Sequence, residues 1–501
     1  MQSRFLVAFG VLVAALAVAL AAPDRYAGSN GAAGAKAVAV PDGIRARGKI
    51  KRVVVIVMEN RTFDNIFGGD TGSLGHPTPF PSADALVPSP IASLMRVTDF
   101  VMTAPPKATR PPMPDNWYNA YQCVAAGGFS DGAWEADARS PMPCSGWHFD
   151  APNGPFWYLD VSNRAVYSAI ARRYELGDAF FAPAATDSYP GHQFIVAGRS
   201  SDSDGDQIAD QPLYTAPPWG TYGGYTTGCA DVPSPGPNVA TPPIVVPALG
   251  PTASPWAVPT TRGFEGECYD AVNFADRLAE AHAKRGTTWK HYATTTAIPA
   301  PFSGEQAFNG FINSKRWWNH RWTPTVSVIA DAQFGRIPNF AWVKPPCVDA
   351  SDHPGTGNGG PSWVEDVVNA IGSNRNQWNE TAIFVLWDDW GGFYDHVIPP
   401  PRRAWDNLGP GLRTPLLVIS PYVRPGTVAH GRADYGSVLR FVEQVEGVRS
   451  LGAIDEHSPD LVGYFDFATM RPFARISTPP VTTWGAACRS KHAHPAAPFR
   501  D

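Results

Sequence analysis

Residues 53–60 read VVVIVMEN, an apolar, β-rich run that stops on a pair of polar side chains. A second run of the same design, TAIFVLWDD at residues 381–389, also ends on a polar pair. Short runs of Val, Ile, Leu and Phe without polar alternation are typical of strands buried on both faces, as in a parallel sheet covered by helices. Ligands bind such sheets at the carboxyl ends of the strands. The two runs therefore predict an α/β sheet with a polar site where both strands end.

The polar residues at the two strand ends are oxygen donors. They are Glu59 and Asn60 after the first run, and Asp388 and Asp389 after the second. Carboxylates and amide carbonyls are hard ligands that suit a divalent cation. For either pair alone, a turn-forming or helix-capping role is the alternative. The presence of both pairs favours one divalent metal site.

Composition limits the class of protein. The chain has 501 residues, of which 44% are apolar and 12% aromatic, enough for one large core or two modest domains. Its formal net charge is -5, and Lys and Arg are not clustered. A nucleic-acid surface needs a basic stripe to meet phosphates. We therefore expect a globular protein that does not bind nucleic acid.

The N-terminus is typical of a secretory signal peptide, predicted over residues 1–21. Arg4 precedes an apolar run that closes on small residues just before Pro23. An N-terminal membrane anchor is the alternative. We expect cleavage near Ala21 and a secreted or periplasmic product without a transmembrane anchor.

Six cysteines follow this segment, so export would bring them into an oxidising compartment. They are Cys123, Cys144, Cys229, Cys268, Cys347 and Cys488. Up to three disulfides can form, and all fifteen pairings of six cysteines are open at this level. No spacing typical of a zinc–thiolate site is present.

Shifts in composition divide the rest of the chain. Residues 22–49 are rich in Ala and Gly and predict a flexible leader, residues 50–475 predict the main domain, and residues 476–501 form a tail rich in Pro and Ala. Within the domain, residues 70–115 and 211–262 are crowded with Pro, Gly, Ser and Thr, which break helices and strands. We expect these two stretches to be surface loops that cap the site.

Helical periodicity and apolar runs alternate along the main domain. The predicted helices cover residues 162–176, 270–286, 363–371 and 435–447, and the predicted later strands cover residues 287–293, 338–344, 381–387 and 415–420. This alternation predicts a doubly wound, mostly parallel α/β sheet with helices on both faces.

Five motifs together resemble a known family. They are VMENRTFDNIFGG at 57–69, DAFFAPAATDSYPGHQFIVAG at 178–198, SDHP at 351–354, WDDWGGFYDHVIPP at 387–400 and RTPLLVISPYVRPG at 413–426. The family is that of bacterial phosphoesterases, which includes secreted phospholipases C and acid phosphatases and belongs to the alkaline-phosphatase-like superfamily. The resemblance spans most of the mature chain. It implies an alkaline-phosphatase-like fold and hydrolysis of a small phosphate ester or a phospholipid headgroup.

The resemblance also implies a mechanism. Ser188, ten residues after Asp178, matches the position of the family's nucleophile, which attacks phosphorus and becomes a phosphoserine that water hydrolyses. A metal held by the four strand-end residues would favour the alkoxide and offset charge on the phosphoryl oxygens. Thr186 and Asp187 are the alternatives for a shifted register. A turn residue before Pro190 is the structural alternative for Ser188.

Other residues receive roles through the same resemblance. His353 and His291 match positions at which the family places histidines that contact the bound phosphate or protonate the leaving group. Asn60 and His396 are further candidate phosphate contacts. Asp395 is expected to orient the metal ligands from the second shell.

Three positions depart from the family pattern. Asp389 stands where most relatives have Glu, Gly191 stands where they have Asn, and the upstream family histidine is replaced near Asp115 and Asn116. The shorter side chain at 389 makes direct ligation by Asp389 less secure. The missing amide at 191 implies that phosphate contacts are weaker or rebuilt from other residues.

An acidic segment, DSDGDQIAD at Asp202–Asp210, resembles a single calcium-binding repeat of the thrombospondin type. It does not fit the EF-hand pattern, and a solvated acidic loop is the alternative to a structural calcium site.

Two other functions share the expected fold. A non-catalytic secreted binding protein could carry a decayed site. A sulfatase-like hydrolase is disfavoured, because Ser188 is not followed by the x-Pro-x-Arg sequence that formylglycine formation needs; His192 stands in place of the Arg.

Overall fold

The computed structural model of the protein describes residues 46, 48–68, 159, 162–183, 188–199, 272–293, 304–308, 323–353, 358–391, 395, 397, 399–400 and 410–489. All of these residues belong to one compact unit, residues 41–501. The expected signal peptide, the calcium-like segment Asp202–Asp210, both loop insertions, Asn116 and His396 lie outside the described residues.

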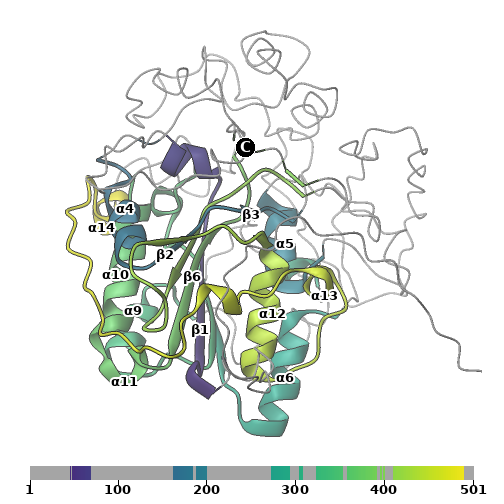
Figure 1. Ribbon diagram of the computed structural model, residues 1–501. Coiled ribbons are helices and arrows are strands. Elements are labelled where there is room, and N and C mark those ends of the chain that lie inside the picture. Colours follow the sequence, from purple (N-terminus) through teal and green to yellow (C-terminus); the bar gives the residue numbers. More distant parts are fainter. Residues whose placement is uncertain are drawn as a thin grey trace, which may run out of the picture. The chain divides into compact units, whose positions relative to one another are not determined.

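The centre of the fold is a seven-stranded sheet with the order β4-β5-β1-β6-β7-β2-β8 (Figure 1). Its strands are β1 (Arg52–Met58), β2 (Glu175–Gly177), β4 (Trp289–Tyr292), β5 (Phe340–Val343), β6 (Thr381–Trp387), β7 (Leu416–Ile419) and β8 (Thr427–Ala429). Only β7 runs against its two neighbours, and the other pairings are parallel. Two short strands, β3 (Phe180–Phe181) and β9 (Ala433–Asp434), form a separate parallel pair. The predicted mostly parallel sheet is confirmed.

Helices cover both faces of the sheet (Figure 1). One side carries α4 (Ala165–Arg173), α9 (Ser327–Gln333), α10 (Gly360–Ser373), α11 (Arg375–Trp378) and α14 (Trp484–Ala487), and the other side carries α5 (Ser188–Ala197), α6 (Phe274–Arg285), α12 (Tyr435–Glu446) and α13 (Ile454–His457). Four short turns complete the described elements: the π-helical η1 (Asp64–Gly68) and the 3-10 helices η8 (Gly304–Ala307), η9 (Val348–Ala350) and η10 (Val462–Tyr464). The doubly wound arrangement is therefore confirmed as well.

Local sequence signals account for the ends of α6 and α12. The Asn273 side chain caps α6 by accepting from the Ala275 N–H, and Asp434 caps α12 in the same way by accepting from the Ser437 N–H. Such side-chain caps satisfy N–H groups that have no partner within the helix. Both helices end at a glycine with positive φ, a conformation in which a Cβ would be strained.

One helix is shorter than its sequence pattern predicts. The periodic run 162–176 predicted a helix to its end, but α4 stops at Arg173. Residues 175–177 form β2, which pairs with both β7 and β8. The prediction was wrong there because hydrogen bonds to two strands distant in sequence outweigh local helical periodicity.

The two strands that the sequence singled out lie side by side. β1 and β6 pair in parallel along their whole length, from Arg52 opposite Thr381 to Met58 opposite Trp387. Every residue of β6 is buried, and every residue of β1 after Arg52 is buried. Burying an aliphatic or Phe side chain stabilises a fold by roughly 1.5–3 kcal/mol. The pairing brings the ends of both strands to one place at the edge of the sheet.

Cysteine pairing is defined for two residues. Cys347, which precedes η9, forms a disulfide with Cys488, which follows α14. The other four cysteines lie outside the described part of the chain. The bond joins the C-terminal segment to the loop after β5.

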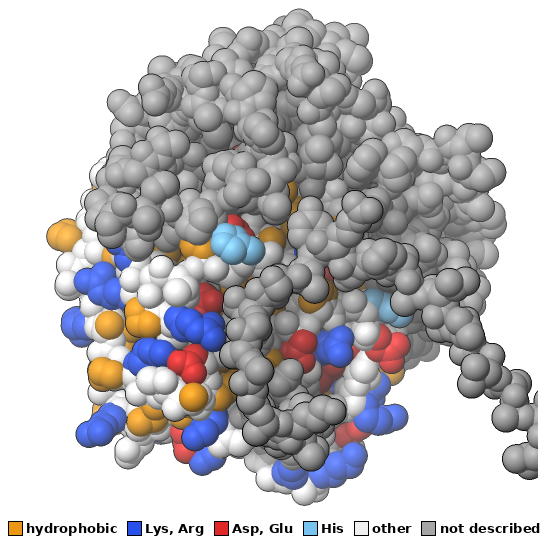
Figure 2. All heavy atoms as spheres, viewed as in Figure 1, with side chains coloured by type: hydrophobic (Ala, Val, Ile, Leu, Met, Phe, Trp, Pro, Cys, Tyr) orange, Lys and Arg blue, Asp and Glu red, His pale blue; other side chains and the backbone are white. Residues whose placement is uncertain are grey.

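Surface charge is mixed on the face drawn in Figure 2. Lys and Arg side chains are interspersed there with Asp, Glu and apolar side chains. Within the described residues, no helix is both long enough and apolar enough to cross a membrane.

Candidate metal centre

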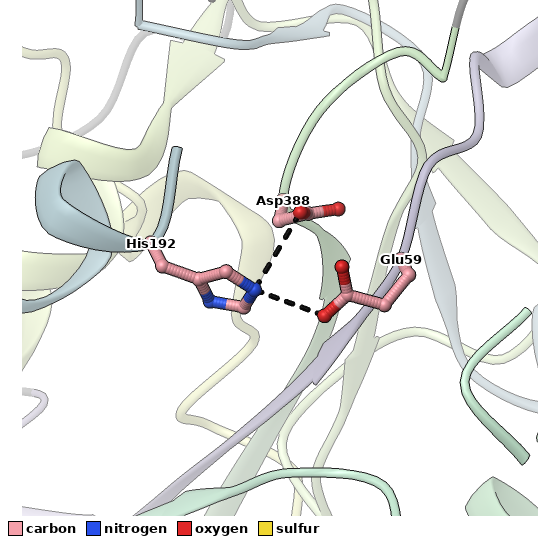
Figure 3. A group of neighbouring side chains, drawn as sticks. All are labelled: Glu59, His192 and Asp388. Atoms are coloured by element: carbon pink, nitrogen blue, oxygen red, sulfur yellow. Dashed lines mark hydrogen bonds and ion pairs between the residues drawn. The ribbon is translucent and has the colours of Figure 1, made fainter. Parts of the chain in front are cut away.

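Three buried side chains meet where β1 and β6 end (Figure 3). His192 Nε2 lies 2.9 Å from Oε1 of Glu59 and 3.5 Å from Oδ2 of Asp388. One potential ligand atom from each residue lies within 4.8 Å of the other two. Atoms bound to one cation at about 2.0–2.6 Å are separated by at most roughly 5 Å, so the three can share a metal ion.

The backbone explains how the three side chains meet. Glu59 directly follows β1 and Asp388 directly follows β6, so the register of two adjacent strands places them together. His192 comes from α5. A Cβ on Gly191 would clash with the carbonyl oxygen of Asp388. Glycine at this position therefore lets α5 approach the end of β6 closely, and this gives a physical reason for the departure from the family's Asn.

Electrostatics at the cluster suit a cation. Burial raises the pKa of Glu59 well above its usual value, and the negative charges of Asp388 and Asp389 raise it further. Burial also lowers the pKa of His192 well below its usual value, so the imidazole is neutral. Among the described residues, none gives Oε2 of the buried Glu59 a hydrogen bond. Two carboxylates and a neutral imidazole form a ligand set that fits a divalent cation, which would offset the repulsion between the acids.

Asn60 and Asp389 lie beside this cluster and support it. The Asn60 backbone N–H donates to Oδ1 of Asp388 at 2.8 Å, and its Nδ2 donates to Oδ1 of Asp389 at 3.0 Å. Asn60 has a φ of 55°, a conformation that Asn tolerates better than most residues. Gly391 donates its N–H to Asp389 at 2.6 Å. Both expected ligands thus lie beside the candidate metal centre: Asn60 orients Asp388 through its backbone N–H, and Asp389 holds the Asn60 side chain.

Asp395 is buried in an ion-pair network. It accepts from Nε of Arg413 at 3.0 Å and from the backbone N–H of Asp64 at 3.1 Å. Arg413 also donates to the Asp64 side chain at 3.0 Å. Asp395 therefore helps to hold η1, the turn that follows the Glu59–Asn60 segment.

His291 lies within β4, in a second buried group. Its Nδ1 is 3.4 Å from Oε1 of Glu305, and Oε2 of Glu305 is 3.4 Å from Nζ of Lys344. Burial lowers the pKa of His291 to about 4, against an opposing effect of Glu305. This imidazole is therefore neutral at the pH of most cells and media.

His353 is connected to the end of β1 through Ser351. Its backbone N–H donates to Oγ of Ser351 at 3.1 Å, and the Ser351 carbonyl accepts from the Glu59 N–H at 2.9 Å. Ser188 is the first residue of α5, but its side chain lies outside the described part, as does all of His396.

Three residues near the centre were not predicted from the sequence. They are His192, Glu305 and Lys344. The sequence could have pointed to Lys344, because this residue directly follows the apolar strand β5, as Glu59 follows β1. His192 lies about one helical turn after Ser188. In a helix, this spacing places the two residues on the same face and could have predicted that His192 lies near the site. Glu305 follows no strand or motif, and only the fold brings it to this place.

Comparison with known proteins gives one match over most of the chain. The model of the family described as "Phosphoesterase family" matches residues 50–449.

Curated relatives match shorter stretches. The chain is 33% identical over 137 residues to a non-hemolytic phospholipase C of Burkholderia pseudomallei (strain K96243). This alignment covers 23% of this chain and 19% of that protein. The chain is 36% identical over 122 residues to non-specific phospholipase C4 of Arabidopsis thaliana. This alignment covers 20% of this chain and 22% of that protein. The aligned stretches thus span only about a fifth of each of these relatives.

A solved structure, a protein in the alkaline phosphatase superfamily from Vibrio parahaemolyticus, aligns with 82% of this chain and 71% of its own. The sequence identity is 11% and the TM-score 0.33.

Proposed function

Because the chain belongs to the Phosphoesterase family, we propose that it hydrolyses phosphate esters at a centre that holds one divalent metal ion. Glu59, His192 and Asp388 would hold the ion, and Asn60 and Asp389 would orient Asp388 or complete the ligand set. The observation that carries this proposal is the meeting of two strand-end carboxylates and a helical imidazole at one buried point. A bound divalent cation supplies a Lewis acid that lowers the pKa of a nearby hydroxyl and offsets phosphoryl charge.

Ser188 is the proposed nucleophile. The helix that begins at Ser188 is fixed against the centre by His192 about one turn later. The serine oxygen would form a bond to phosphorus while the bond to the leaving alcohol breaks, and the alcohol takes up a proton. Water would then cleave the phosphoserine and restore the hydroxyl. His353 and His291 are the proposed phosphate contacts or proton donors.

The proposed substrates are small phosphate esters and phospholipid headgroups. Relatives named phospholipase C favour the second class, although each aligns with the chain over only a fraction of its length. We also propose export of the protein, as a secreted or periplasmic enzyme, from the signal-like sequence at residues 1–21. The presence of Glu59, His192 and Asp388 at one point favours an enzyme over a non-catalytic binding protein with a decayed site.

Hydrolysis assays test this proposal. The purified, metal-loaded protein should hydrolyse p-nitrophenyl phosphate, p-nitrophenyl phosphorylcholine or both, and a chelator should abolish the activity until a divalent cation is restored. Preference for the first substrate indicates a phosphatase, and preference for the second a phospholipase C. Folded, metal-loaded protein that hydrolyses neither across the range from pH 4 to 9 would contradict the proposal.

A further inference from the structure

Asp352 combines deep burial with an uncommon backbone conformation. Its φ is 75°, in the left-handed region that few residues other than glycine adopt, and only 5% of its surface is exposed. Among the described residues, Asn60 is the other non-glycine residue with a positive φ. A backbone in this region costs free energy and persists only where the surrounding contacts hold it. The contacts of Asp352 therefore indicate what this conformation is for.

The carboxylate of Asp352 lies against three elements of the fold. Tyr167 on α4 donates its hydroxyl to Oδ2 at 2.5 Å, and Trp387 at the end of β6 donates Nε1 to the same oxygen at 3.2 Å. The rings of Tyr167 and Trp387 pack edge to face, with centroids 5.2 Å apart. A Cβ on Gly360, at the start of α10, would lie 1.9 Å from Oδ1. Glycine at that position therefore leaves the room that the carboxylate fills.

The residue before Asp352 connects the same segment to β1. The Ser351 carbonyl accepts from the Glu59 N–H at 2.9 Å, and Oγ of Ser351 accepts from the His353 N–H at 3.1 Å. Ser351 thus contacts the residue that follows β1, and Asp352 contacts the last residue of β6. These are the two strand ends that bring the carboxylates of the candidate metal centre together.

The backbone alone does not require an aspartate at position 352. Glycine would adopt the same left-handed conformation without strain. What the aspartate adds is an acceptor that ties this residue to Tyr167 and Trp387. Because the dihedral angles at residue 352 set the direction of the next residue, the same anchor fixes His353, which is 6% exposed.

We propose that Asp352 is a positioning residue, whose carboxylate fixes the backbone of His353 against the ends of β1 and β6 so that His353 is held in place for the phosphate ester. The inference rests on the proposed function, because it assumes that His353 contacts the phosphate or donates a proton. A small displacement of such a group lowers the rate of the reaction strongly.

A double-mutant cycle with His353 tests the inference. Asp352→Gly keeps the backbone conformation and removes the anchor, and it is compared with His353→Ala and with the double variant. The measured quantities are kcat and KM with the better of the two p-nitrophenyl substrates. Asp352→Gly should lower kcat/KM by at least about tenfold. In the His353→Ala background, the same change should alter kcat/KM by less than about threefold, because the residue through which Asp352 acts is gone.

Binding of Mn²⁺ to the metal-free protein, measured by calorimetry, separates this role from support of the metal centre. Asp352→Gly leaves Glu59, His192 and Asp388 in the chain, so its Mn²⁺ affinity should stay within about threefold of the parent. A fall in Mn²⁺ affinity that matches the fall in kcat/KM would show that Asp352 supports the metal centre and would overturn the inference.

Two further variants keep the test decisive if Asp352→Gly does not fold. Tyr167→Phe removes one donor to the carboxylate and should lower kcat/KM in the parent but not in the His353→Ala background. Asp352→Asn keeps an acceptor oxygen and tolerates a positive φ, so its kcat/KM should lie closer to the parent than that of Asp352→Gly. An asparagine variant as impaired as the glycine variant would contradict the anchoring role.

A matched control is Asp331→Asn on α9. Asp331 accepts from the Tyr292 hydroxyl at 2.8 Å, a bond of the same kind as that between Tyr167 and Asp352, and it also pairs with Lys290 and Arg336. This variant should keep the kcat/KM of the parent.

Three results would overturn the inference while leaving the proposed function intact. One is parent-like kcat/KM of folded Asp352→Gly or Tyr167→Phe. Another is an equal loss in the parent and in the His353→Ala background, which would mean a purely structural role. The third is parent-like activity of His353→Ala. A parent protein that hydrolyses neither substrate would instead refute the proposed function itself.

Discussion

Glu59 and Asp388 lie 329 residues apart in the chain, yet their carboxylates meet the same atom, Nε2 of His192, at 2.9 and 3.5 Å. The cause is the register of two neighbouring parallel strands, in which Met58 pairs with Trp387. Glu59 directly follows Met58, and Asp388 directly follows Trp387. The candidate metal centre is therefore a consequence of strand pairing. Substitutions that change the packing at the carboxyl ends of β1 and β6 should change metal binding.

Loss of His192 should weaken metal binding. His192→Ala removes the imidazole and leaves two buried carboxylates that repel each other, so we expect Mn²⁺ affinity to fall by at least about tenfold. Calorimetry on the metal-free protein measures this directly. The control is His282→Gln on α6, where the ring contacts the Thr287 carbonyl. Equal Mn²⁺ affinity of the two variants would exclude His192 as a ligand.

Ser188→Ala should remove nearly all hydrolysis of phosphate esters while the thermal unfolding midpoint stays close to that of the parent, because the change deletes one oxygen. Ser188→Thr should keep part of the rate, since it keeps a hydroxyl. Thr186→Ala should have a mild effect. Activity of Ser188→Ala near the parent rate would mean that another group attacks phosphorus, and rapid-quench detection of a phosphoenzyme would then be negative.

A side chain at position 191 should disturb the centre by packing alone. Gly191→Ala places a Cβ against the Asp388 carbonyl oxygen, so α5 must shift away and carry His192 with it. Overpacking of this kind typically costs about 1–3 kcal/mol of stability. We expect a lower unfolding midpoint and weaker Mn²⁺ binding. Gly463→Ala is the control, because its Cβ would meet no atom within 4 Å; similar behaviour of both variants would refute the packing argument.

Stability should depend on pH through Glu443. Burial raises its pKa from 4.5 to about 9 in the folded protein, so folding favours the protonated form. This contribution is complete below about pH 4.5 and is lost as the pH rises towards 9, at up to about 1.4 kcal/mol per pH unit. Glu443→Gln should flatten the decline in unfolding free energy between pH 5 and 9. An unchanged pH profile of the variant would assign the decline to other groups.

Much of the sheet could be predicted from short stretches of sequence. The runs 53–58 and 381–387 are apolar without alternation, and only strands covered on both faces bury such runs completely. The predicted helix 162–176 wrongly includes residues 175 and 176, because their role in β2 depends on partners that are distant in sequence.

The sequence by itself determined that two strands end in oxygen ligands, because burial patterns and metal-binding residue types are local properties of the chain. Only the tertiary structure decided which side chains join Glu59 and Asp388. His192 reaches them because Gly191 allows α5 to approach β6, and Glu305 reaches Lys344 because η8 packs on that same helix. These contacts depend on how elements pack against one another, and packing distances between segments far apart in the chain are not encoded in any single stretch of residues.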